Sequence, residues 1–200
     1  AVTLRATGDS SDFRLSAADR KTLLSLARKT LVSYITTRTV EEPAPETLSD
    51  AAKSPCGAFV TLEKNGDLRG CIGQFEPAGP LHKVVQDMAI AAAVNDPRFP
   101  PVRPEELKQI EIEISVLTPL RKIRSIDEFI LGRHGIYLRK GMRSGTFLPQ
   151  VAEQTGWTKE EFLGHCAQDK AGIGWNGWKD AELYVYEAIV FSERELNELH

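Results

Sequence analysis

The dipeptide Asn65-Gly66 constrains the fold of this chain more than any other feature, because two β-like segments flank it. Both residues tolerate the positive φ angles that a type I′ turn requires, and such turns join antiparallel strands. We therefore predict a β-hairpin with strands over 57–64 and 67–73. A hairpin at this position favours an antiparallel sheet over a doubly wound parallel one.

The two-residue turn also predicts which residues of the hairpin face each other. The expected cross-strand pairs are Lys64 with Asp67, Leu62 with Arg69 and Val60 with Cys71. Side chains alternate along a strand, so each strand has two distinct faces. The face expected in the core carries Phe59, Leu68, Gly70 and Ile72, and the opposite face carries Val60, Leu62, Arg69 and Cys71.

Arg69 and Cys71 form the chemically suggestive pair of this hairpin. A nearby permanent cation stabilises thiolate over thiol, and the thiolate is the nucleophile and the metal ligand. Gly70 and Gly73 weaken a strand and are typical of a bulge or of close approach by a backbone or a ligand. We therefore predict catalytic roles for Cys71 and Arg69 and binding roles for Gly70 and Gly73. The structural alternative is a small half-buried thiol beside a solvated arginine.

Hydrophobic periodicity and capping residues predict the other elements. Ser16 is a candidate N-cap for an amphipathic helix, with Asp19 at its N3 position. Further capping signals stand at Thr158 and Ser192. The expected helices cover 16–37, 80–94 and 158–170, and the expected strands cover 110–116 and 183–191. In 110–116, isoleucine and valine alternate with Glu111, Glu113 and Ser115, which predicts a strand with one wet face.

The second half of the chain repeats the first in outline. A second hairpin, formed by 135–140 and 146–148, is followed by a helix, a loop and a strand, as the first hairpin is. Internal duplication of topology and chance recurrence of common elements both explain this order. We predict an α+β fold with a mostly antiparallel sheet flanked by helices. The expected divisions are a flexible lead-in over 1–15 and one domain over 16–200, with two lobes over about 16–120 and 121–200.

The composition of the chain limits the kinds of partner and of cellular location that we expect for it. A net charge of −3 gives no general attraction to phosphate backbones, so the charge disfavours nucleic-acid binding in the absence of a local basic patch. The longest apolar run, 88–94, is far shorter than the roughly 20 residues of a membrane span. The three cysteines form no Cys-x-x-Cys pair and predict free thiols in a reducing cytoplasm. We predict neither a metal site nor a cofactor.

Four residues elsewhere complete the predicted site. A stiff, proline-rich segment holds Asp96 and Arg98, which either bind a polar or anionic ligand near the hairpin or only pair with each other. His134 precedes the second hairpin, and a pseudo-twofold arrangement of the hairpins would bring it to Cys71 as a base. The alternative is an exposed loop histidine. Gln150 is a weaker binding candidate, or an amide bonded to the backbone.

A set of motifs follows in fixed order along the chain. They are Leu68-Arg-Gly-Cys-Ile-Gly73, Ala91-Ala-Ala, Asp96-Pro-Arg-Phe-Pro-Pro101, Ile114-Ser-Val-Leu-Thr-Pro119, Gly135-Ile, Phe147-Leu-Pro-Gln-Val151, Gly156-Trp157 and Lys170-Ala-Gly172. Together they resemble the AMMECR domain family, and the similarity covers about 16–191. The first hexapeptide and the Asp-Pro-Arg-Phe-Pro-Pro run are the specific part of this resemblance.

The resemblance implies an α+β fold with an internally repeated, barrel-like antiparallel sheet. It implies no settled activity, because the family is largely uncharacterised. Bacterial and archaeal members are associated with a Memo-type protein and a radical-SAM protein in what is called the AmmeMemoRadiSam system. Two hypotheses therefore stay open: an enzyme or small-molecule site at Arg69 and Cys71, and a non-catalytic accessory module for such partners.

Overall fold

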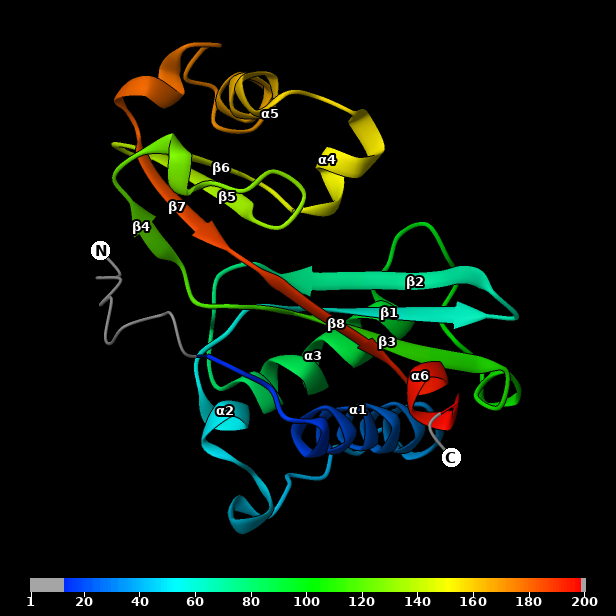
Figure 1. Ribbon diagram of the computed structural model, residues 1–200. Coiled ribbons are helices and arrows are strands. Elements are labelled where there is room, and N and C mark those ends of the chain that lie inside the picture. Colours follow the sequence, from blue (N-terminus) through cyan, green and yellow to red (C-terminus); the bar gives the residue numbers. More distant parts are fainter. Residues whose placement is uncertain (1–12, 199–200) are drawn as a thin grey trace. The chain divides into compact units, whose positions relative to one another are not determined.

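The chain folds into two units, each built on a four-stranded antiparallel sheet (Figure 1). The computed structural model describes residues 13–198. The Cys71 unit comprises 13–117 and 189–198, and the His134 unit comprises 118–188. Most of the predicted lead-in, residues 1–12, lies outside the described residues.

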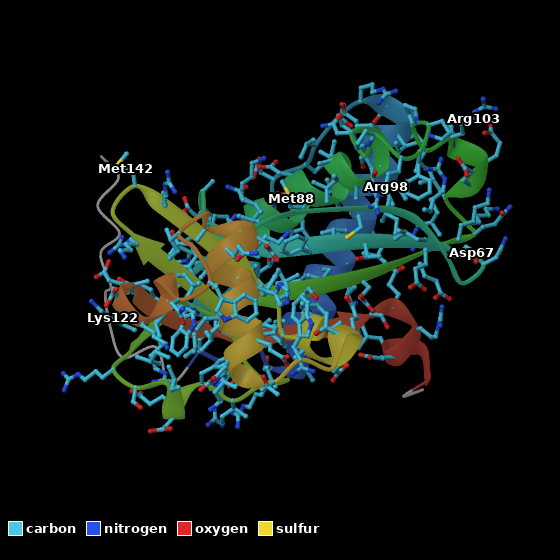
Figure 2. The ribbon with its side chains drawn as sticks, turned by 90° about the horizontal axis from the view of Figure 1, so that it is seen from above. Asp67, Met88, Arg98, Arg103, Lys122 and Met142 are labelled. Atoms are coloured by element: carbon cyan, nitrogen blue, oxygen red, sulfur yellow. The ribbon has the colours of Figure 1, made fainter. Side chains whose placement is uncertain are left out.

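In the Cys71 unit, the strand order is β2-β1-β3-β8. The β1–β2 hairpin turns at Asn65 and Gly66, which have φ angles of 54° and 88°, as predicted. Figure 2 labels Asp67, the first residue after this turn. The strands are β1 (Ala58–Lys64), β2 (Asp67–Gln74), β3 (Ile110–Leu117) and β8 (Ala188–Ser192), and the helices are α1 (Ala17–Thr37), α2 (Asp50–Lys53), α3 (Leu81–Val94) and α6 (Glu193–Glu198).

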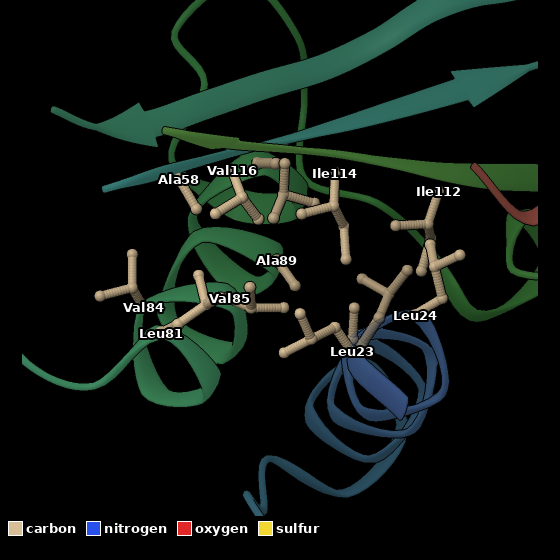
Figure 3. Packing of buried hydrophobic residues seen from close by; sticks show 14 of the residues in the cluster. Leu23, Leu24, Ala58, Leu81, Val84, Val85, Ala89, Ile112, Ile114 and Val116 are labelled. Carbon is tan, nitrogen blue, oxygen red and sulfur yellow. The ribbon is translucent and has the colours of Figure 1, made fainter. Parts of the chain in front are cut away.

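Helices α1 and α3 cover one face of this sheet (Figure 1). The predicted capping box between Ser16 and Asp19 begins α1. Figure 3 shows Leu23 of α1 and Val85 of α3 packed below Ile114 of β3, and all three side chains are fully buried. Burial of each such side chain contributes roughly 1.5–3 kcal/mol. We call the opposite face of β1 and β2 the helix-free face, because α1 and α3 lie on the other side of the sheet; α6 borders it at Glu63 through Arg194.

In the His134 unit, the strand order is β4-β7-β5-β6. Phe129, Ile136, Leu138 and Phe162 are fully buried in its core. The second hairpin turns at Gly141-Met142, so its return strand begins earlier than expected. A φ of 60° at Gly141 permits this tight turn. The strands are β4 (Arg121–Ile123), β5 (Gly135–Lys140), β6 (Arg143–Phe147) and β7 (Glu182–Tyr186), and the helices are α4 (Gln150–Thr155) and α5 (Lys159–His165), followed by a π-helical turn (Cys166–Lys170).

The two units follow the same order of elements. Each has a hairpin, a helical segment and a third strand that pairs with the first strand of the hairpin. The fourth strand of each sheet directly follows, in the chain, a strand of the other sheet. Strand β8 follows β7 but pairs with β3, and β4 follows β3 but pairs with β7. The predicted single strand 183–191 is therefore wrong, because the chain leaves one sheet and joins the other at Glu187.

The α+β class and the antiparallel pairing are confirmed. The described residues form two open sheets and no closed barrel, so the barrel-like arrangement is not confirmed. Within residues 13–198, none of the helices combines the length and the hydrophobicity that crossing a membrane demands.

Candidate functional site

A β-bulge changes the predicted register of the first hairpin. The pairing shifts by one residue next to Leu62, so that Leu62 faces Gly70 and Thr61 faces Cys71. Arg69 is the extra, unpaired residue. The predicted partners of Arg69 and Cys71 are therefore wrong, because a bulge inserts one residue on one strand only.

The shift also corrects the predicted faces. Val60 and Leu62 are fully buried against the helices, whereas Phe59 is half-buried and Leu68 is 43% exposed. A one-residue change of register moves a strand's side chains to the other face of the sheet. Cys71 consequently lies on the helix-free face beside Phe59, and not beside Val60 and Leu62.

Cys71 is the only half-exposed cysteine of the three, all of which lie within the described residues. Its Sγ atom accepts a hydrogen bond from Thr61 Oγ1 at 3.3 Å. Cys56 and Cys166 are buried, and burial raises the pKa of each thiol to about 12. Reactive thiols need access and a stabilised thiolate, so Cys71 is the one candidate nucleophile among them.

Asp96 and Arg98 close the free edge of β2 at Cys71. Asp96 Oδ2 accepts a hydrogen bond from the Cys71 amide at 2.9 Å, and Arg98 Nη2 donates to the Cys71 carbonyl oxygen at 3.5 Å. The two side chains also pair with each other through N–O distances of 3.0 and 2.7 Å. Arg98, followed by the Cys71 amide, holds the pKa of Asp96 well below its usual range.

This ion pair takes the place of a neighbouring strand at the edge of the sheet. Figure 2 shows Arg98 beside β2 on the segment that follows α3. An unpaired edge exposes amide and carbonyl groups, and side chains that occupy them satisfy the backbone. Asp96 and Arg98 thus pair with each other, which was one of the two predicted alternatives. A ligand contact by either residue stays a prediction.

Arg69 is neutralised by Glu106. Its Nε and Nη2 atoms donate to the two carboxylate oxygens at 3.0 Å each, and the two side chains are only 11% and 16% exposed. Lys64 Nζ adds a contact of 2.9 Å. Chiefly because of Arg69, the pKa of Glu106 falls to about 2. Arg69 is therefore not the solvated residue of the structural alternative, and its catalytic role stays a prediction.

Gly70 and Gly73 allow close approaches inside the unit. A Cβ atom at Gly70 would lie 2.1 Å from the carbonyl oxygen of Ala92 in α3. A Cβ atom at Gly73 would lie 2.0 Å from the ring of Phe59. The predicted bulge and close approach are both present, and the approaching groups belong to the protein itself.

His134 and Gln150 belong to the other unit. The His134 side chain is 7% exposed, so the exposed-histidine alternative is wrong. Its Nδ1 atom accepts a hydrogen bond from the Ile130 amide at 3.1 Å, Nε2 lies 3.7 Å from Glu187, and burial lowers its pKa. The Oε1 atom of Gln150 is buried and has no hydrogen-bond partner among the described residues. A partnership of His134 with Cys71 stays a prediction.

A cavity of the Cys71 unit lies away from these groups. It has a volume of about 550 Å³ and lies between α1 and the segment 41–48. None of the predicted site residues lines it. Across residues 13–198, no cluster of three His, Cys, Asp or Glu side chains is arranged to hold a metal ion.

Comparison with known proteins identifies the family of this chain. The AMMECR1 family model matches residues 24–191, which is most of the sequence. The chain belongs to the AMMECR1 family. This confirms the resemblance that the Leu68–Gly73 hexapeptide and the other motifs indicated.

Relatives in this family cover nearly the whole chain. Protein MK0488 of Methanopyrus kandleri is 45% identical over 193 residues, which are 91% of this chain and 92% of that protein. Protein TK0174 of Thermococcus kodakarensis is 40% identical over 86% of this chain and 88% of its own length. The crystal structure of uncharacterized protein PH0010 from Pyrococcus horikoshii superposes with a TM-score of 0.69 at 38% identity, covering 86% of this chain and 90% of that one.

Three residues that contact or neighbour the AMMECR1 hexapeptide were not identified as site residues from the sequence. Thr61 pairs with Cys71 in place of the predicted Val60, because the bulge shifts the register by one residue. Glu106 lies in a short 3₁₀ segment with no periodic pattern, 37 residues after Arg69. Glu113 was predicted only as part of the wet face of a strand, yet the register places it opposite Thr61. Gly70 and Gly73 are the local signals that indicated a bulge, and the bulge lies beside Gly70.

Proposed function

We propose that this AMMECR1-family protein binds a small molecule at Cys71 and that the Cys71 thiolate acts there as a nucleophile. The observation that carries the proposal is the hydrogen bond from Thr61 Oγ1 to Cys71 Sγ on the helix-free face. A hydroxyl donor stabilises the charged thiolate relative to the neutral thiol. A half-buried position also admits a small reagent while limiting contact with water.

The residues around the thiol have supporting roles in this proposal. Asp96 holds the backbone of Cys71 through its amide, which fixes where the thiol points. Arg98 is the guanidinium that reaches the Cys71 backbone, through its carbonyl oxygen, and it is also paired with Asp96, whereas the guanidinium of Arg69 pairs with Glu106. The hydrogen bond to Asp96 is the main cause that raises the pKa of Arg98. We therefore assign Arg69 to holding the bulge in place.

Iodoacetamide labelling of the folded full-length chain tests the proposal. We expect Cys71 to react at pH 7 at least about 100-fold faster than Cys56 and Cys166, because its thiol is half-exposed and accepts a hydrogen bond from Thr61, whereas the other two thiols are buried. Peptide mass spectrometry distinguishes the three sites in one sample, so the two buried cysteines are internal controls. Equal labelling of all three, or reaction of Cys71 only as a free thiol near pH 8.5, would contradict the proposal.

A second candidate is an accessory module that binds Memo-type and radical-SAM proteins. It is favoured by the neutralisation of the charged residues, since Arg69 and Asp96 are both committed to internal ion pairs. Such pairs leave the hexapeptide with a folded, largely neutral surface. The apolar side chain of Leu68, which is 43% exposed, then becomes its most prominent feature.

Co-purification with each tagged partner tests this candidate. We expect Leu68→Ser to reduce capture by about tenfold, the loss typical of one buried apolar contact at an interface. Val32→Ser is the matched control, because Val32 is comparably exposed on α1. If the intact chain captures neither partner, or if both variants bind equally, the accessory role at Leu68 is wrong.

A further inference from the structure

We infer that Glu113 accepts the proton of the Cys71 thiol and that Thr61 carries the proton between them. This inference rests on the proposed function of Cys71 as a nucleophile. Glu113 acts through Thr61 and is therefore a positioning residue that controls the protonation of the thiol. The role belongs to a residue of the same sheet, so it needs no group from the His134 unit.

The three residues form a straight row across the sheet. Thr61 of β1 is paired with Cys71 of β2 on one side and with Glu113 of β3 on the other. Directly opposed side chains of antiparallel strands have Cβ atoms about 4.5–5.5 Å apart. Because opposed residues share a face, Thr61 lies between Cys71 and Glu113 on the helix-free face, and its hydroxyl contacts the thiol.

The carboxyl group of Glu113 is available for such a role. The neighbouring carboxylates Glu63 and Glu111 both pair with Arg194 of α6. Glu113, by contrast, has no hydrogen bond or ion pair in the described part of the chain. A half-buried carboxylate that lacks a partner is costly, and it gains from taking up a proton.

The charges around Glu113 also favour the uptake of a proton by its carboxylate. The charged groups that act on it are Glu63 from β1 and Arg194 and Glu195 from α6. Glu111 is two residues away on the same face of β3, and Cys71 lies two strands away on β2. Burial, and then the charges of Glu63 and Glu195, raise the pKa of Glu113, while Arg194 opposes them. A carboxylate of raised pKa is a stronger base in the neutral range than an ordinary glutamate.

The proton transfer balances as follows. In the structure, Thr61 Oγ1 donates to Cys71 Sγ and makes no hydrogen bond to Glu113 among the described residues, so the transfer requires the Glu113 side chain to rotate towards Thr61 Oγ1. The Sγ–H bond of Cys71 then breaks and its proton goes to Thr61 Oγ1, while the hydroxyl proton of Thr61 goes to a carboxylate oxygen of Glu113. The products are a thiolate that accepts a hydrogen bond from Thr61 and a neutral Glu113. Donation by Thr61 Oγ1 to Sγ is the direction found in the structure. The thiolate electron pair then forms a bond to an electrophilic carbon, from which a leaving group departs.

The pH profile of Cys71 alkylation by iodoacetamide tests the inference. The ionised carboxylate is the base, so the rate should rise as the pH passes through the raised pKa of Glu113, below the range in which a free thiol ionises. We expect this acidic limb in the wild type and in Glu111→Gln, which removes a carboxylate from the same face of β3. Glu113→Gln and Thr61→Val should lose the limb and react about tenfold more slowly at pH 6.

Two further results decide between the possible outcomes. If the wild type and Glu113→Gln are equally reactive at pH 6, Glu113 is not the acceptor, although Cys71 remains the proposed nucleophile. If Cys71 is inert in every variant, the proposed function and this inference are both overturned. Glu113→Asp keeps the carboxylate and should retain the acidic limb, whereas a purely structural role would lower the rate equally at every pH.

Discussion

Gly70→Ala is expected to destabilise the Cys71 unit by about 3 kcal/mol, the upper part of the range for overpacked cores. The added Cβ atom would lie 2.1 Å from the carbonyl oxygen of Ala92, a backbone atom of α3 that cannot rotate away. Either β2 or α3 must move, and Cys71 is the next residue along the strand. Urea unfolding followed by circular dichroism measures the loss in free energy.

Gly79→Ala is the control for this substitution. A Cβ atom at Gly79 meets no atom within 4 Å, and its φ angle is not in the left-handed region. The control should therefore change stability by less than about 0.5 kcal/mol, as exposed substitutions usually do. Equal stability of the two variants would show that α3 does not approach β2 at Gly70 in solution.

Local signals in the sequence predicted the elements that depend on nearby residues. The positive φ angles at Asn65-Gly66, the capping box between Ser16 and Asp19, and the alternation of β3 are all formed as expected. Each of these features is decided within a few residues of chain, where propensity and periodicity are informative. They were sufficient to predict the α+β class and to place Cys71 away from the core.

The contacts of the site could not be predicted in the same way. The same Asn-Gly turn is compatible with a regular ladder and with a bulge at Arg69, so the pairing of Cys71 was wrong by one residue. Glu106 reaches Arg69 across 37 residues of sequence, and no local pattern reports a contact of that length. The identity of the pairing partners follows from tertiary packing, which a single sequence does not display.

Glu106→Ala is expected to be the most destabilising change in the ion-pair cluster, at about 3–5 kcal/mol. The substitution removes both acceptors of the Arg69 guanidinium and leaves a positive charge whose side chain is only 11% exposed. Loss of the partner of a buried charge costs more than the pair itself contributes, because the remaining charge is desolvated and unpaired. Urea unfolding again measures the effect.

A double substitution separates the effect of the ion pair on stability from the effect of side-chain packing in the cluster. Arg69→Met with Glu106→Leu removes both charges, and this variant should recover most of the stability that Glu106→Ala loses.

The pH dependence of stability gives an independent check of the Arg69–Glu106 ion pair. The pKa of Glu106 is lowered from 4.5 to about 2, so its ionised form stabilises the fold above pH 4.5, and this contribution is lost as the pH falls through about 2. The wild type should therefore lose stability over this range more steeply than the double variant, and parallel curves would mean that Arg69 and Glu106 are not paired in solution.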